Sequence, residues 1–578
     1  VIISSCGLHI TDESRQWFRH MLNNEFALLM SVPSGIASWV LATRLHRRWQ
    51  LSRGKHRSLA GHSRWSQRLA RWIPYYDYGN APVFDQDGAP PDLVAMRLLA
   101  FERLSQHLED SCPLTLAATR DIKPHVSDVQ FTSRYRVPFQ FAQWAQDRLP
   151  MGYFWQSSDG VWLQDLDDNR FIDVTGSYGV NLFGYDFYKQ TMAQGAQEVA
   201  ALGPVLGGYH PVVQYNVHRL CDISGLDEVS FHMSGTEAVM QAVRLARYHT
   251  GRHQLVRFTG AYHGWWEDVQ PGPGNPLPAP KETFTLADMS ERALQVLRTR
   301  NDIACVLINP LQALHPNQGA PTDSTLIEGR RSARYDKAAY TQWLQQLRQV
   351  CTEKGIALIF DEVFLGFRLG VGGAQAYFGV RADMVTYGKT LGGGLPIGVL
   401  CGEHRWMKRF DEDRPGHICF SRGTFNAHPQ VMGSMKAFLK QLDTPEVQAM
   451  LDGMEDRWQQ RLALFNARLQ EAGVPVRVEG MLTVWTILYT IPSRYHWMLQ
   501  YYLRKHRIAL SWVGTGRMIF SLNFTDTDFD ALIQAFVAAC REMQVDGWWW
   551  QSPSLTTQGI KRQVLREMMR KLMNPSHA

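Results

Sequence analysis

The sequence lacks any pair of cysteines in the CxxC spacing typical of zinc sites and redox disulfides. Its eight cysteines are scattered along 578 residues, which predicts buried thiols in a reducing, cytoplasmic compartment. Internal repeats and low-complexity tracts are missing too. Hydrophobic residues make up 45% of the chain and charged residues 20%, so the composition excludes disordered and fibrous proteins.

Acidic residues are missing from Phe26 to Tyr76, although this span holds nine Lys and Arg residues. The span opens with an uncharged stretch, Phe26–Thr43, which is at the lower limit for a membrane helix and contains Pro33. Two interpretations remain open, namely peripheral contact of residues 26–72 with an anionic membrane, or packing within an upstream domain. We expect no nucleic-acid partner. Acidic and polar residues precede the apolar stretch, so no cleavable signal peptide is expected.

The pattern of apolar and polar residues changes along the chain, which predicts a fold of several domains. From about residue 200 to 400, apolar runs such as Val229–Met233 and Ala357–Phe360 alternate with amphipathic stretches such as Glu237–Tyr248. This alternation predicts a parallel sheet covered by helices on both faces. The expected parts are a helical N-terminal extension of unknown function (1–125), the first part of a small domain (126–200), a large α/β domain (201–440), an α+β small domain (441–545) and a basic helical tail (546–578). The first residue is Val rather than Met, which predicts that the chain was processed or cut from a longer one.

A carboxylate and a lysine each follow one of the expected strands. Asp361 comes directly after the apolar run Leu358–Phe360, and Lys389 follows Met384–Tyr387 and precedes a run of glycines. Open α/β sheets place ligands at the carboxyl ends of their strands. A desolvated lysine amine can form an imine with an aldehyde. Each residue alone also fits a non-catalytic role, because Asp361 could be purely structural and Lys389 could simply face solvent.

Two further segments add groups that a cofactor needs. Ser234, Gly235 and Thr236 end one strand and open a helix, which predicts either a phosphate seat or a plain helix cap. Tyr262 follows another strand and is either a ring-stacking aromatic or a core residue. Together, a phosphate seat, a stacking ring, a carboxylate and an imine-forming lysine are the groups that pyridoxal phosphate requires.

The sequence resembles the class III aminotransferases, which are fold-type I pyridoxal phosphate enzymes, and most closely their glutamate-1-semialdehyde aminomutase-like branch. The resemblance extends from about Phe131 to Cys540. It implies a large α/β domain with a mixed, mainly parallel sheet, a smaller α+β domain and an extra helical N-terminal region. The matching segments are Gly176-Ser177-Tyr178-Gly179, Ser234-Gly235-Thr236-Glu237-Ala238, Tyr262-His263-Gly264, Asp361-Glu362-Val363, Gly388-Lys389 and Gly423-Thr424-Phe425-Asn426-Ala427-His428-Pro429.

The resemblance implies a role for each matched residue and no metal. Lys389 would form the imine with pyridoxal 5′-phosphate and carry the proton between substrate and cofactor, and Asp361 would pair with the pyridine nitrogen. Tyr262, counted with them as catalytic, and Val363 would pack on the two faces of the ring. Thr424 would reach the phosphate from the partner subunit, which requires a homodimer. The other implied contacts are Ser234, Gly235, Thr236 and His263 for the cofactor, and Ser177, Tyr178 and Arg422 for the substrate.

The sequence also departs from the family pattern. Phe364 stands where many relatives have Gln, and Asn309-Pro310 stands where they have Glu-Pro, followed by a longer segment through Asn317-Gln318-Gly319. No clear counterpart of the aminomutase motif that grips a substrate carboxylate is present near the N-terminus. The missing carboxylate motif argues against a true aminomutase, whereas an apolar residue at the position of Phe364 is common in the aminomutase branch.

We therefore expect an enzyme that moves an amino group from a donor to an aldehyde or ketone, with a hydrophobic acceptor from secondary metabolism. Class III domains fused behind a reductase occur in pathways to prodigiosin-type pyrrole pigments, which narrows the expectation to a pyrrole precursor. Two alternatives stay open. One is an aminomutase or another pyridoxal phosphate isomerase, which would turn over without a donor. The other is a catalytically silent, membrane-bound assembly partner, which would not bind the cofactor.

Overall fold

The computed structural model describes residues 34–57, 61–78, 82–270, 272–278, 280–314, 333–511 and 516–573. The chain divides into two compact units between Gly54 and Lys55. In the first unit the described residues form helix α2 (Ser34–Gly54). Residues 26–33 of the uncharged stretch and the insertion around Asn317 lie outside the described residues. Among the helices that are described, none is both long and apolar enough to cross a membrane.

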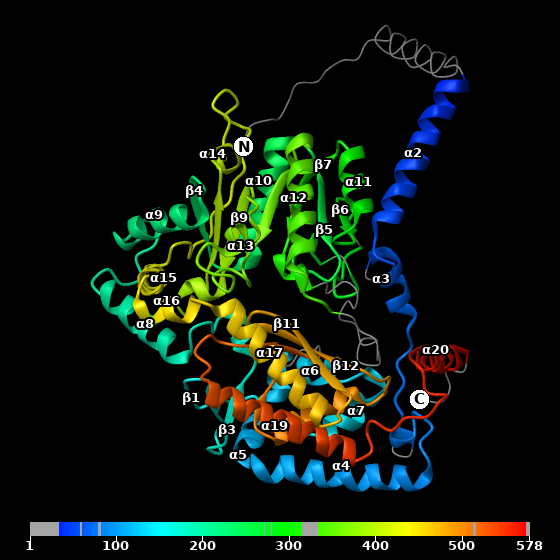
Figure 1. Cartoon of the computed structure of the whole chain (residues 1–578). Helices are drawn as coiled ribbons and strands as arrows, with labels where there is room; N and C mark the ends of the chain where they lie inside the picture. Colours follow the sequence, from blue (N-terminus) through cyan, green and yellow to red (C-terminus); the bar gives the residue numbers. More distant parts are fainter. Residues whose placement is uncertain are drawn as a thin grey trace, which may run out of the picture. The chain divides into compact units, whose positions relative to one another are not determined.

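A seven-stranded mixed sheet lies at the centre of the second unit (Figure 1). Its strand order is β4-β10-β9-β8-β7-β5-β6, and the neighbours from β9 to β6 are parallel, whereas β10 runs antiparallel to both β4 and β9. Most of these strands are short and buried along their whole length, as a sheet covered on both faces requires. The expected fold-type I architecture is confirmed. The strands are β4 (Glu228–His232), β5 (Gln254–Phe258), β6 (Thr283–Leu286), β7 (Ile303–Ile308), β8 (Ala357–Asp361), β9 (Met384–Gly388) and β10 (Gly398–Gly402).

Helix α10 (Gly235–Thr250) shows how the sequence defines the helices of this layer. The Ser234 side chain caps its first turn by accepting a hydrogen bond from the Glu237 amide at 3.3 Å, and Gly251 ends it with a φ of +64°. Its apolar face packs against the sheet in one buried cluster. The expected helix over Glu237–Tyr248 is confirmed as α10, and α11 (Glu291–Thr299) and α12 (Lys337–Lys354) belong to the same half. The other helices of this half are α8 (Tyr185–Glu198), α9 (Val212–Ser224), α13 (Gly373–Phe378), α14 (His404–Met407), α15 (Pro429–Gln441) and α16 (Pro445–Leu451).

Two smaller sheets accompany the large one, and the first of them combines residues from both ends of the family-like region. In the first, β13 (Ile508–Ala509) pairs in parallel with β3 (Arg170–Asp173) beside β1 (Ser157–Asp159) and β2 (Trp162–Gln164). The second contains β11 (Val476–Met481), β12 (Val484–Tyr489) and β14 (Arg517–Ile519), and α17 (Met454–Glu471) and α19 (Asp526–Val545) lie beside it (Figure 1). Helix α18 (Leu499–Lys505) precedes β13.

The sequence predicts a strand over Met518–Phe524, and this prediction is wrong at its carboxyl end. Strand β14 ends at Ile519. Beyond it, the Phe520 amide donates to the carbonyl of Thr483 and the Leu522 amide donates to the carbonyl of Leu182, so these backbone groups bond to loops instead of a sheet neighbour. The apolar residues here are buried by tertiary contacts and do not require a longer strand.

The N-terminal helices of the second unit are fastened to its C-terminal part by Arg97. Its guanidinium donates to Asp87 at 2.6 and 2.8 Å, to the Phe84 carbonyl at 2.7 Å and to the Gly547 carbonyl at 2.9 Å, and both charged side chains are fully buried. These contacts hold α4 against the end of α19. The helices concerned are α4 (Pro91–Ser111), α5 (Pro113–Ile122), α6 (Ser127–Tyr135) and α7 (Phe139–Arg148), and the basic tail forms α20 (Thr557–Met573).

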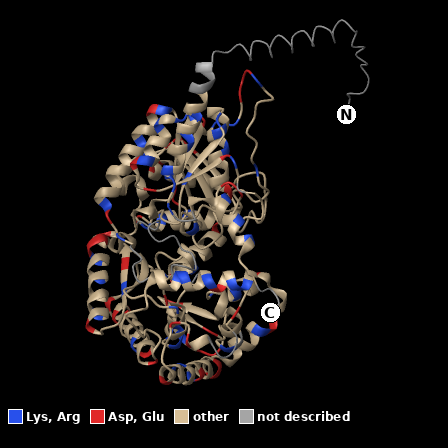
Figure 2. Ribbon diagram, turned by 90° about the vertical axis from the view of Figure 1, so that its right-hand side faces the viewer, with Lys and Arg blue, Asp and Glu red and all other residues tan. Residues whose placement is uncertain are grey.

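Helix α3 (Ser63–Trp72) buries its polar side and exposes its apolar side. Ser66 and Gln67 are buried, and the Gln67 amide donates to three carbonyls of residues 272–277 at 3.0–3.3 Å. Trp65 and Trp72 are 60% and 71% exposed. Elsewhere on the face seen in Figure 2, basic and acidic residues are interspersed. An exposed stripe of tryptophans beside arginines is typical of a contact surface.

We predict that Arg97→Met lowers the free energy of unfolding by about 3–5 kcal/mol, because it leaves the Asp87 carboxylate buried without its partner. The matched control is Arg103→Met, since Arg103 pairs with Asp546 at 3.0 Å but is 63% exposed. The control should cost at most about 1 kcal/mol. Urea denaturation followed by circular dichroism measures both, and equal losses in the two variants would contradict the prediction.

Candidate active site

Asp361 and Lys389 lie at the same edge of the large sheet. Strands β8 and β9 are parallel neighbours with Asp361 opposite Thr386, so the carboxylate that ends β8 and the lysine that follows β9 come together. Lys389 has a φ of +49°, a left-handed conformation that is uncommon for a side chain of this size. Such strain is concentrated at functional sites.

The amine of Lys389 lies in an apolar environment. Burial lowers its pKa to about 8, with a smaller effect in the same direction from the cation of Arg368, while Asp361 opposes the shift. Its Nζ atom lies 4.7 Å from the centroid of the Phe364 ring. Gly179 packs against the same ring so closely that a Cβ atom there would come within 2.6 Å of it. The neutral, nucleophilic form of this amine is therefore far more accessible than in an ordinary lysine.

Asp361 is held by three hydrogen bonds. Its Oδ2 lies 2.7 Å from Nδ1 of His263, and its Oδ1 accepts from the Val363 amide at 3.1 Å and from the Thr386 hydroxyl at 3.3 Å. Burial lowers the pKa of His263, and the nearby cation of Arg257 adds to this, although Asp361 opposes the shift. A neutral His263 that donates from Nδ1 orients the carboxylate without neutralising it. The structure thus places His263, a cofactor contact implied by the resemblance, against the carboxylate of Asp361.

The first turn of α10 faces the same edge and is tightly packed. A Cβ atom on Gly235 would lie 2.6 Å from Val363 Cγ1, and one on Gly264 would lie 2.5 Å from the Thr236 hydroxyl. Glycine is therefore required at both positions for the backbone to approach closely. Ser234 caps the helix, so the plain cap interpretation holds for its side chain, while the backbone amides of this turn remain suited to an anion.

Tyr262 is not a core aromatic. Its side chain is 65% exposed, and burial of its hydroxyl together with the charge of Asp361 raises its pKa. The alternative of a core residue is therefore wrong, and the ring lies free to stack on a ligand.

Ser177 and Tyr178 form a strained loop next to Gly179. Both have left-handed backbones, with φ of 44° and 56°. The Ser177 hydroxyl lies 2.9 Å from that of Tyr185, which donates to Asp173 at 2.7 Å. Tyr178 is partly exposed, as expected of a residue at the mouth of a site.

Arg368 and Glu362 are buried charged residues for which the sequence offered no role. The guanidinium of Arg368 donates to the carbonyls of Gly179 and Asn181 at 3.2 and 2.8 Å, and to Thr483 and Phe520 at 3.0 and 2.9 Å. It thus ties the strained loop to the small domain. Burial raises the pKa of Glu362 to about 8, and its Oε2 accepts from the Ala374 amide at 2.7 Å. The sequence signal for the buried roles of Glu362 and Arg368 is their charge within an otherwise apolar stretch.

Thr424 and Arg422 are exposed. Arg422 reaches the carbonyl of Gly207 at 3.4 Å. The roles assigned to Thr424 and Arg422 by resemblance remain predictions.

The geometry fits pyridoxal 5′-phosphate. The site offers a lysine of lowered pKa, a carboxylate supported by three donors and a helix N-terminus whose glycines admit a close ligand. Each part of the cofactor has a residue that could hold it. Lys389 could bind the aldehyde, Asp361 with His263 the pyridine nitrogen, and Tyr262 the ring. The first turn of α10 could hold the phosphate. An exposed Tyr262 beside Asp361 suits a flat heterocycle.

Comparison with known proteins agrees with this geometry. The family model for aminotransferase class-III matches residues 143–540. Glutamate-1-semialdehyde 2,1-aminomutase of Halorubrum lacusprofundi is 34% identical over 306 residues, which cover 50% of this chain and 64% of that enzyme. The chain spans about two thirds of the length of the curated relatives it matches.

Solved structures give the same result. A transaminase with pyridoxal phosphate bound is 26% identical, with a TM-score of 0.57 over 69% of this chain and 92% of its own. An omega-transaminase from Sphaerobacter thermophilus is 25% identical, with a TM-score of 0.56 over 68% of this chain and 92% of its own. With a family match over most of its length and a site suited to pyridoxal phosphate, the chain belongs to the class III aminotransferase family.

Proposed function

We propose that this protein is a pyridoxal phosphate-dependent aminotransferase that moves an amino group from a donor to an aldehyde or ketone. The observation that carries the proposal is the buried amine of Lys389, with a pKa of about 8, at the same sheet edge as Asp361. When bound, the cofactor supplies a reactive aldehyde and an electron-withdrawing ring. A full set of cofactor groups argues against a catalytically silent partner.

Each residue then has a task that follows from its surroundings. Lys389 Nζ acts as nucleophile and afterwards holds the proton taken from the substrate carbon. Asp361 would keep a proton on the pyridine nitrogen of the cofactor, and His263 is a positioning residue that orients Asp361 through Nδ1. Tyr262 and Val363 confine the ring. The backbone amides of Ser234, Gly235 and Thr236, with the Thr236 hydroxyl, would hold the phosphate.

The acceptor that we propose is a hydrophobic aldehyde or ketone of secondary metabolism. Phe364 lies beside Lys389 and Gly179, so the wall next to the amine is apolar. The narrower proposal of a prodigiosin-type pyrrole precursor rests on the resemblance alone. The second candidate is an aminomutase, which the identity of 34% to such an enzyme favours. Turnover of a single substrate without an amino donor would select the aminomutase.

We predict that borohydride reduction of the holoenzyme attaches the cofactor permanently to Lys389 as a covalent tag. In Lys389→Ala the tag should be lost, and kcat for transamination should fall by at least about a thousandfold, because the nucleophile and the proton carrier are both removed. Peptide mapping locates the tag. Circular dichroism and gel filtration check that the variant is folded. A tag on another residue, or normal turnover by the variant, would overturn the proposal.

The pH dependence of cofactor attachment gives a second readout of the same prediction. An amine with a pKa of about 8 is protonated and unreactive below that pH, so the rate of attachment to the apoprotein should rise with pH and level off above about pH 8 to 9. An ordinary lysine would continue to gain reactivity to beyond pH 10. A continued rise of that kind would contradict the lowered pKa.

We further propose a homodimer in which Thr424 completes the site of the partner subunit. Thr424 is exposed and lies between Phe420 and Phe425, which are 68% and 51% exposed, and Tyr209 is also exposed. Large exposed aromatic residues of this kind are typical of subunit interfaces.

Hybrid dimers test the contribution of Thr424 across the interface. Subunits carrying Lys389→Ala are mixed with subunits carrying Thr424→Ala, each weakly active alone. If Thr424 acts on the partner's site, one site of each hybrid holds both native residues, so the isolated hybrid has about half of the activity of a wild-type dimer. If Thr424 acts within its own chain, both sites stay defective and activity does not return.

We also propose that the cytoplasmic enzyme touches an anionic membrane surface through α3. Its exposed stripe of Trp65, Leu69 and Trp72 is flanked by Arg64, Arg68 and Arg71, and the surrounding span holds no acid. Tryptophans and arginines on one helix face suit the lipid interface.

We predict that the protein floats with vesicles containing phosphatidylglycerol and not with pure phosphatidylcholine. Replacing both Trp65 and Trp72 with alanine should abolish flotation, and each Arg→Gln change in α3 should weaken it about fivefold. Leu114→Ala is the matched control, because Leu114 is an exposed apolar residue on another helix. Equal flotation of the double variant and the control would refute the contact.

A further inference from the structure

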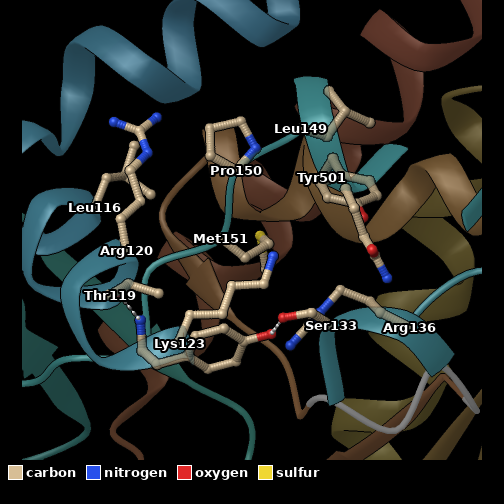
Figure 3. Close-up of a pocket in the computed structure, with 12 residues that line it drawn as sticks. Leu116, Thr119, Arg120, Lys123, Ser133, Arg136, Leu149, Pro150, Met151 and Tyr501 are labelled. Carbon is tan, nitrogen blue, oxygen red and sulfur yellow. Dashed lines mark hydrogen bonds between the residues drawn. The ribbon is translucent and has the colours of Figure 1, made fainter. Parts of the chain in front are cut away.

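A pocket separate from the Asp361–Lys389 site lies among helices α5, α6 and α7 and the segment that follows α7 (Figure 3). It holds about 130 Å³ and shares no residue with the candidate active site. Leu116, Leu149 and Met151 form its apolar wall. Part of its lining, residues 116–136, precedes the region that the family model matches. The pocket is therefore built partly from sequence that lies outside the matched aminotransferase region.

The charge of this pocket has one sign. Arg120, Lys123 and Arg136 line it, and none of the described residues in its lining is Asp or Glu. Arg120 forms an ion pair with Glu109, which lies outside the lining. Lys123 and Arg136 therefore supply most of the positive charge, and Figure 3 shows the Lys123 side chain extending into the pocket.

Arg136 is a buried cation with unused hydrogen-bonding capacity. It is 5% exposed, and Nη1 donates to Gln500 at 3.2 Å. Its Nε atom is buried and has no partner among the residues that the structure describes. An unpaired donor on a buried charge is costly unless an acceptor binds there.

The pKa of Tyr153 reflects the positive electrostatic potential in the pocket. Its hydroxyl lies 3.3 Å from that of Ser133. Burial by itself would raise the pKa of Tyr153, but Arg136 and the hydroxyl groups nearby outweigh burial and lower it. A negative charge is therefore stabilised at this point of the pocket.

We propose that this pocket binds a small oxyanion, a carboxylate or a phosphate, through Lys123 and Arg136. The Ser133 and Tyr153 hydroxyls supply neutral hydrogen bonds, and Leu149 and Met151 cover a short apolar portion of the ligand. Arg136 also contacts Gln500 in α18, so a bound anion bridges the N-terminal helices and the small domain. The site is independent of the transamination that we propose above.

Calorimetric titration of the holoenzyme tests this site, because bound cofactor occupies the phosphate seat of α10. The probes are inorganic phosphate and butyrate at constant ionic strength, with butylammonium as the cationic control. We expect one of the anions to bind and butylammonium not to bind. Tighter binding of butyrate identifies an organic carboxylate, and tighter binding of phosphate identifies a compact phosphate. Lys123→Gln should weaken binding at least tenfold while the visible spectrum of the cofactor stays unchanged.

The matched control is Arg134→Gln, on the same helix as Ser133 but outside the lining. It should bind the anion as tightly as the wild type. Arg136→Gln is a second variant, checked by circular dichroism because Arg136 is buried. The proposal is overturned if neither anion binds, or if Lys123→Gln binds as tightly as Arg134→Gln.

Discussion

The parallel pairing of β8 and β9 is the constraint on which the active site depends. It brings a carboxylate and an amine to one edge of a sheet that is buried on both faces. Burial makes the amine less basic, while the carboxylate beside it keeps three hydrogen-bond donors. A charge pair exposed to water would have neither property, because solvent would restore the ordinary pKa of the lysine. The chemistry therefore follows from the layer structure around the sheet.

Arg368 links this edge to the small domain. The same guanidinium that makes Lys389 less basic also fastens Gly179 and Asn181 to Thr483 and Phe520. The strained backbone of Ser177 and Tyr178 is held by these contacts and by the hydroxyl of Tyr185. Electrostatics and loop geometry at the site thus share one residue, so a change at Arg368 alters both together.

Sequence reasoning found the elements whose signals are local. The strand before Asp361 is an uninterrupted apolar run, the strand before Lys389 is mostly apolar, and their ends mark the site without knowledge of tertiary contacts. It did not find β10, a five-residue strand that begins and ends with glycine, or the end of β14, because both depend on which neighbours the chain meets. The role of Arg368 and the buried polar side of α3 are also long-range, since their partners lie far away in the sequence. The contributions of Thr424 and Arg422 depend on a partner subunit or ligand and stay predictions.

The pairing of β3 with β13 has a consequence for the growing chain. Ile172 meets Ile508, more than three hundred residues later, in a parallel ladder. During translation, the hairpin of β2 and β3 leaves the ribosome with one edge unpaired until Ile508 and Ala509 have been made. Strand β13 has only two residues, so few backbone groups of β3 wait for a partner. This limits the risk that the unpaired edge of β3 aggregates while the chain is still on the ribosome.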